Sequence, residues 1–116
     1  METTLKQFVI VPKRPRMSTG KVASQVAHAS FMALEGENKA LKSLWRDSGM
    51  CVIVLQCKDT AQLMGIAKYF EQWGIKHHLY IDEGMTEVDM GTPTALATGI
   101  LKREQFWMLS QLKLYK

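Results

Sequence analysis

Short apolar runs alternate along this chain with longer segments whose apolar residues recur at helical spacing. The runs have the length of strands and occupy residues 8–11, 51–55, 78–81 and 94–98. The segments with helical spacing are 21–34, 38–46, 60–73 and 103–110, and residues 112–115 form a short extended end. The continuous apolar run 51–55 predicts a central parallel strand. The alternation as a whole predicts an α/β layered fold with a mostly parallel or mixed sheet.

Length and composition fit one domain over residues 1–116. With 47% hydrophobic and 22% charged residues, a chain of this length can build a hydrophobic core. No apolar run approaches the roughly 20 residues that cross a bilayer. Residues 1–6 also lack the basic-then-apolar order of a signal peptide, so we expect a cytoplasmic protein that does not associate with membranes. Cys51 and Cys57 would lie about 20 Å apart along one strand, which predicts reduced packing residues rather than a disulfide.

A cluster of basic residues precedes and enters the first predicted helix. Its members fall within nine residues of a chain whose net charge is +4, and they are Lys13, Arg14, Arg16 and Lys21. A helix start presents unpaired backbone N–H groups and the positive end of the helix dipole, both of which attract anions. A basic loop at this position therefore predicts a site for phosphate groups, although a solvated basic loop is the alternative interpretation.

The residues at this helix start limit which kind of phosphate site is possible. Ser18 or Thr19 is expected to cap the helix, and Gly20 is expected to allow a close backbone approach. A nucleotide-binding P-loop is excluded, because Pro15 stands where its first glycine is required and Val22 where its Ser or Thr is required. We therefore do not expect ATP or GTP hydrolysis.

A second candidate segment follows the predicted strand 78–81. Asp82 comes directly after three apolar residues and should lie at the mouth of the sheet, where its carboxylate can pair with Lys21 or orient a water. Thr86, four residues further on, is the threonine that we expect to contact substrate. Ligands of such sheets lie at the carboxyl ends of strands, so Lys21 and Asp82 are predicted to share one site. The remaining carboxylates of the segment are interpreted as solvated, and they are Glu83, Glu87 and Asp89.

The histidines do not predict a metal site. His28 lies on the packed face of the first helix and is interpreted as a structural histidine rather than a base. His77 and His78 are neighbours on a strand and should face opposite ways, which disfavours a shared metal ion. The carboxylates after residue 81 lack the ligand spacing of a calcium loop.

Four segments together carry a family resemblance. Residues 20–29 read Gly-Lys-Val-Ala-Ser-Gln-Val-Ala-His-Ala, which resembles the G-K-[IV]-A-x-Q-x-x-H-A signature of the archaeal and eukaryotic type (type 2) of peptidyl-tRNA hydrolase. Residues 82–87 resemble that family's D-A-G-x-T-[QE] segment, and residues 91–96 resemble its P-G-[ST]-x-T-x-L. Residues 112–115 are similar to its L-K-L-[YL] terminus. The matches occur in order over nearly the whole chain, which makes the set specific.

The resemblance implies a three-layer α/β/α domain with a four-stranded mixed sheet, often dimeric, that hydrolyses the ester between a peptide and the 3′ end of tRNA. The partners implied are tRNA and a second copy of the chain, not DNA, and no metal or organic cofactor is required. The catalytic candidates are Lys21, Asp82 and Thr86. Asp82 would position or partly deprotonate a water, and Lys21 would stabilise the oxyanion or the leaving oxygen. The substrate-binding candidates are Lys13, Arg14, Arg16, Gly20, Gln25, His28 and Thr94.

The sequence also differs from the family pattern. Ser18-Thr19 replaces a glycine and a lysine of the family's basic loop, from which we expect weaker tRNA affinity, and Glu83 replaces a small residue. Residues 97–102 contain no proline where the family has G-I-G-P-x-P. Two other functions stay open: a non-catalytic RNA- or protein-binding module on the same fold, and a small-molecule phosphate-binding protein.

Overall fold

The computed structural model describes residues 4–84 and 87–116. In this part of the chain the strands form one five-stranded sheet with the order β3-β4-β1-β2-β5. The strands are β1 (Leu5–Pro12), β2 (Cys51–Cys57), β3 (His77–Ile81), β4 (Pro93–Lys102) and β5 (Lys113–Leu114). The helices are α1 (Thr19–Glu35), α2 (Lys39–Asp47), α3 (Thr60–Gln72) and the 3-10 helix η1 (Arg103–Leu109).

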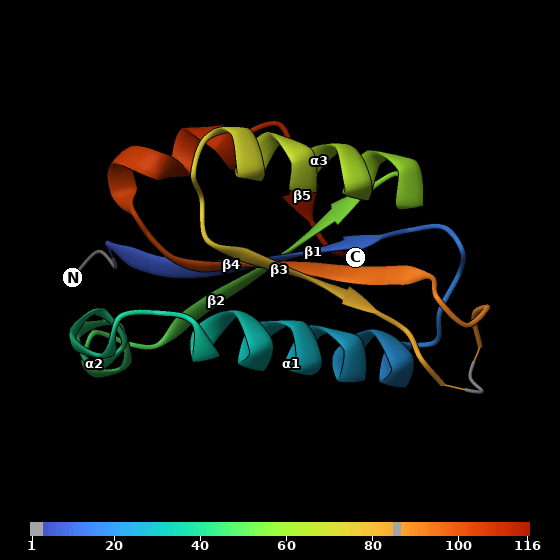
Figure 1. The fold of residues 1–116 in the computed structure, drawn as a ribbon, viewed down its shortest axis with the longest axis horizontal. Helices are drawn as coiled ribbons and strands as arrows, with labels where there is room; N and C mark the ends of the chain where they lie inside the picture. The colour runs from blue at the N-terminus through green and yellow to red at the C-terminus, as the bar shows by residue number, and fades with distance from the viewer. Residues whose placement is uncertain (1–3, 85–86) are drawn as a thin grey trace.

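The helices cover the two faces of the sheet as an α/β/α arrangement. Helices α1 and α2 lie on one face, and α3 and η1 lie on the other (Figure 1). The predicted three-layer α/β fold is therefore confirmed. The sheet has five strands rather than four, because the two-residue β5 near the end of the chain pairs with β2 through Leu55–Leu114 and Gln56–Lys113.

The sheet is mixed rather than mostly parallel. β1 and β2 run parallel, whereas β1 with β4 and β3 with β4 run antiparallel. Two antiparallel steps through β4 make β3 parallel to β1, so both strands end at the same edge of the sheet. This topology confirms the expectation that the loops after these two strands meet.

The prediction of a central strand at 51–55 is wrong in one respect. β2 does pair in parallel with β1, but on its other side β5 pairs only with Leu55 and Gln56. The side chain of Val52 is 38% exposed as a result. An apolar strand that borders an open groove has the same local pattern as one buried on both faces, which explains the error.

Alternate residues of β1 enter two hydrophobic clusters, one on each face of the sheet. Phe8 and Ile10 pack in one cluster with Leu63 and Phe70 of α3. Val9 and Val11 pack in the other, and its α1 residues are small ones such as Ala29 and Ala33. Small side chains let the helix lie close to the sheet, as the sequence predicted.

Local chemistry fixes the ends of the helices. The Ser18 hydroxyl accepts a hydrogen bond from the Lys21 backbone N–H at 3.2 Å and caps α1, and Asn38 and Asp59 cap α2 and α3 in the same way. The predicted final helix forms as the 3-10 helix η1, in which Phe106 and the buried Leu109 are spaced by the three residues of one 3-10 turn.

The cysteines are packing residues, as predicted. Both are free, and Cys57 is buried in β2. Burial, together with the nearby charge of Asp59, raises the pKa of the Cys57 thiol to about 11. In the part of the chain that the structure describes, no helix is both long and apolar enough to cross a membrane.

Candidate active site

An ion pair joins the two segments that follow β1 and β3. The Lys21 ammonium, in the first turn of α1, lies 2.7 Å from Oδ1 of Asp82, directly after β3. The two side chains are only 10% and 5% exposed. The prediction that Lys21 and Asp82 share a site is therefore confirmed in its geometry, because parallel strands bring both residues to one edge of the sheet.

Gln25 and Thr94 support this pair from behind. Gln25 lies one helical turn after Lys21, and its Nε2 donates to Oδ1 of Asp82 at 3.3 Å and to Oγ1 of Thr94 at 2.7 Å. Thr94 lies in β4 and is fully buried. The structure thus gives Thr94 a supporting place under Gln25, whereas the sequence assigned it to substrate binding.

The backbone around Asp82 is also held in place. Its N–H donates to the Thr92 carbonyl at 2.9 Å, and its carbonyl accepts from the Gly91 N–H at 2.7 Å. Gly91 has a φ of 89°, a conformation that favours glycine. These hydrogen bonds join residue 82 to residues 91 and 92, so the Asp82 side chain is attached to a backbone that is held in place.

A contact that the sequence did not indicate ties this segment to α1. The Glu87 carboxylate accepts from the Ser18 N–H at 2.6 Å and from the Ser18 hydroxyl. A carboxylate of the chain itself therefore binds the N-cap residue of the helix start that was predicted to attract phosphate. The hydroxyl and N–H of Ser18, with the charge of Lys21, lower the pKa of Glu87 below its ordinary value.

The other predicted residues of α1 take different positions. His28 is exposed, stacks on Tyr80 with ring centroids 4.9 Å apart, and has its Nε2 3.4 Å from Oγ of Ser24. These contacts of His28 are with Tyr80 and Ser24 and not with the Lys21–Asp82 pair. A Cβ at Gly20 would meet nothing within 4 Å, so its surroundings do not require a glycine. Thr86, the third catalytic candidate, lies outside the described residues.

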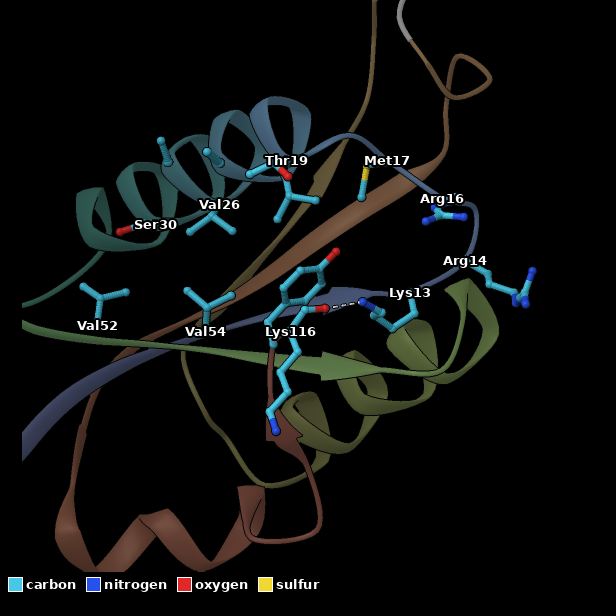
Figure 2. Close-up of a pocket in the computed structure, with 14 residues that line it drawn as sticks. Lys13, Arg14, Arg16, Met17, Thr19, Val26, Ser30, Val52, Val54 and Lys116 are labelled. Atoms are coloured by element: carbon cyan, nitrogen blue, oxygen red, sulfur yellow. Dashed lines mark hydrogen bonds between the residues drawn. The ribbon is translucent and has the colours of Figure 1, made fainter.

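The basic loop borders a groove on the other side of α1. This groove has a volume of about 890 Å³ and lies between α1, β2 and residues 115–116 (Figure 2). Lys13, Arg14 and Arg16 line it, whereas Lys21 and Asp82 do not. The sequence thus placed a cationic cluster correctly along the chain, but the fold divides it between two sides of one helix.

The buried pair has the components of an acid–base site. A carboxylate at this position can orient a water and accept its proton, and an ammonium at hydrogen-bond distance can stabilise negative charge on an adjacent oxygen. Among residues 4–84 and 87–116, no group of three or more His, Cys, Asp or Glu side chains is arranged to hold a metal ion.

Comparison with known proteins decides the family. The model of the family described as "Peptidyl-tRNA hydrolase PTH2" matches residues 5–115. The chain belongs to this family. The matched range contains the whole Lys21–Asp82 site together with its supports, Gln25 and Thr94.

Individual relatives in the peptidyl-tRNA hydrolase family agree with this assignment. A peptidyl-tRNA hydrolase of Haloquadratum walsbyi is 36% identical over 95 residues, which cover 82% of this chain and 85% of that protein. A peptidyl-tRNA hydrolase of Methanopyrus kandleri is 35% identical over 102 residues, covering 86% of this chain and 88% of that protein. A peptidyl-tRNA hydrolase of Pyrobaculum aerophilum is 36% identical over 118 residues, covering 97% and 98% of the two chains.

Proposed function

We propose that this protein hydrolyses the ester bond between a peptide and the 3′ end of tRNA, acting in the cytoplasm. The observation that carries the proposal is the buried Lys21–Asp82 pair, set at 2.7 Å where β1 and β3 end. Membership of the peptidyl-tRNA hydrolase family and the names of the relatives support the substrate class.

In the proposed mechanism the Asp82 carboxylate orients a water and accepts one of its protons as the water oxygen attacks the ester carbonyl. The Lys21 ammonium stabilises the negative charge that develops on the carbonyl oxygen. The bond between the carbonyl carbon and the ribose oxygen then breaks, and the leaving ribose oxygen takes up the proton from Asp82. The products are a peptide with a free carboxyl group and a tRNA with a free 3′-terminal ribose hydroxyl.

Burial strengthens each of these roles. In a site that excludes most water, a preorganised charge stabilises a transition state more than it would in solvent, and the loss of one such group typically costs about 100- to 1,000-fold in rate. Gln25 keeps the carboxylate oriented from behind. Thr86 is proposed to hold the substrate or the attacking water by a hydrogen bond.

The basic loop is proposed to hold the tRNA phosphates. Arg14 and Arg16 are exposed, and Lys13 is half-buried beside them. Contacts from such side chains to phosphates are sequence-independent and weaken as salt increases. We also propose that the protein forms a homodimer, which light scattering after size-exclusion chromatography tests.

The experiment that tests the function measures the release of labelled N-acetyl amino acid from N-acetyl-aminoacyl-tRNA. Free aminoacyl-tRNA is the specificity control, since its α-amino group is not acylated. Lys21→Ala and Asp82→Ala should lose turnover, whereas the matched exposed-site variants Lys68→Ala and Asp47→Ala should retain it. Salt-sensitive tRNA binding without hydrolysis by the wild-type protein would replace the proposal with a non-catalytic RNA-binding module.

A further inference from the structure

The floor of the groove beside α1 is apolar and open. One wall is a stripe of small and branched side chains on α1, and the other is the part of β2 that β5 leaves uncovered. The residues of this floor are Val22, Ala23, Val26, Ala27, Val52 and Val54. Figure 2 shows Val26 and Val52 facing the same space from the helix and from the strand. The floor therefore offers apolar contact to a flat or elongated ligand.

The charged side chains that line this groove are all cationic. They come from the loop after β1 and from the end of the described chain, and they are Lys13, Arg14, Arg16 and Lys116. Among residues 4–84 and 87–116, no acidic side chain lines the groove. A ligand that complements both features must carry negative charge along one side and apolar, flat groups along the other.

Tyr115 supplies an aromatic ring to the same groove. Its N–H donates to the Val54 carbonyl at 2.9 Å, which fixes the residue against β2. The Lys13 ammonium lies 4.4 Å from the centroid of the ring and donates to the Lys116 main-chain oxygen at 2.5 Å. Proteins that bind single-stranded nucleic acids combine cationic side chains, which contact the phosphates, with aromatic rings, on which the bases stack.

We propose that this groove binds unpaired nucleotides of an RNA, with phosphates along the basic rim and bases against Tyr115 and the apolar floor. The identity of that RNA as the single-stranded 3′ end of tRNA rests on the proposed function. Thr19 and Val22 line the groove and flank Lys21 in the first turn of α1. A strand that leaves the groove around the start of α1 would run toward the Lys21–Asp82 pair.

Two other occupants fit the groove less well. An apolar peptide would use the floor but would bring no negative charge to the cationic rim. A second copy of the chain docked through this face would bring two cationic rims together, which is repulsive. Charge complementarity therefore selects a polyanion with flat apolar groups.

The test is fluorescence anisotropy with a 5′-fluorescein-labelled six-nucleotide single-stranded RNA. Ala27→Glu adds a carboxylate to the exposed floor and should weaken binding at least tenfold. The matched control is Ala61→Glu, which adds the same charge at an exposed position of α3 on the opposite face of the sheet and should bind like wild type. Tyr115→Leu keeps apolar packing but removes the ring, and it should weaken binding about 5- to 150-fold, the range of one base–aromatic stack.

Three results would overturn the proposal. The first is equal RNA affinity of the wild-type, Ala27→Glu and Tyr115→Leu proteins, with their folds checked by circular dichroism. The second is displacement of the RNA by an N-acetylated apolar peptide at lower concentration than by unlabelled RNA. The third is a change in oligomeric state with Ala27→Glu while RNA binding is unchanged. Because the oligonucleotide carries no ester, its binding is independent of hydrolysis, so failure of the groove and failure of the proposed function are separately visible.

Discussion

Removal of either charge of the Lys21–Asp82 pair should destabilise the protein, and removal of both should restore most of the loss. Lys21→Met leaves a carboxylate that is 5% exposed without its ammonium, and Asp82→Asn leaves an ammonium that is 10% exposed without its carboxylate. Breaking one side of a buried pair typically costs about 3–5 kcal/mol, because the remaining charge is desolvated without its countercharge. Since this pair lies at the edge of the sheet, we expect each single variant to lose about 3 kcal/mol of unfolding free energy.

The double variant carries no charge at either position. We expect it to lose about 1 kcal/mol, because a neutral replacement of a buried pair is often close to neutral in stability. The resulting coupling, about 5 kcal/mol, agrees in size with the attraction of two unit charges 4 Å apart at an effective dielectric constant of 20, about 4 kcal/mol.

Urea unfolding of the four proteins at pH 7 measures this coupling as a double-mutant cycle. The control cycle uses Arg46→Met and Asp47→Asn, whose exposed side chains form an ion pair at 3.6 Å. That cycle should give a coupling of at most about 1 kcal/mol. Single variants at Lys21 and Asp82 that each lose under 1 kcal/mol, with additive effects, would refute the interpretation of a desolvated pair.

Three further results are expected. Gly99→Ala should lose about 1–3 kcal/mol of unfolding free energy, because its Cβ would lie 2.5 Å from Oε2 of the buried Glu37, whereas Gly36→Ala, with only one atom at 4.0 Å, should not show this steric loss. Burial raises the pKa of Glu37, but hydrogen bonds from backbone N–H groups and the charge of Lys76 lower it by more. The net pKa therefore lies below its ordinary value of 4.5. Its ionised form therefore stabilises the fold above pH 4.5, and in acid titrations the difference in unfolding free energy between wild type and Glu37→Gln should shrink as the pH falls below 4.5; a constant difference would contradict this. Arg14→Gln and Arg16→Gln should each reduce the slope of log affinity for tRNA against log salt concentration by about 0.7–0.9, and an unchanged slope would show that these residues do not contact phosphates.

The sequence was sufficient for the parts of the site that follow from strand direction. Asp82 comes directly after an apolar strand and Lys21 begins the helix that follows another, so an α/β layering alone placed them at one edge of the sheet. Ser18 was one of two residues expected to cap α1, and it does so. These predictions depend on residues close together in the chain and on a topology with few alternatives.

Contacts between distant loops were beyond the reach of the sequence. Glu87 lies 69 positions from Ser18, and an isolated loop carboxylate shows no periodicity that distinguishes a capping role from a solvated one. The groove could not be predicted from the sequence for a similar reason. The apolar run 51–55 indicates a strand but not that one side of it stays uncovered, since this depends on how far β5 extends along it. The hydrogen bond between Thr94 and Gln25 was hidden because threonine is common in strands for other reasons.

The central claim is that Lys21 and Asp82 act together on one chemical step. The most direct test is kcat/KM for hydrolysis of N-acetyl-aminoacyl-tRNA by wild type, Lys21→Met, Asp82→Asn and the double variant, all checked for folding. Each single variant should lose at least about 100-fold, and the double variant should be no worse than the poorer single variant, because groups that act as a unit are strongly non-additive. Folded single variants with near-wild-type turnover, or a double variant whose loss is the product of two independent losses, would contradict the claim.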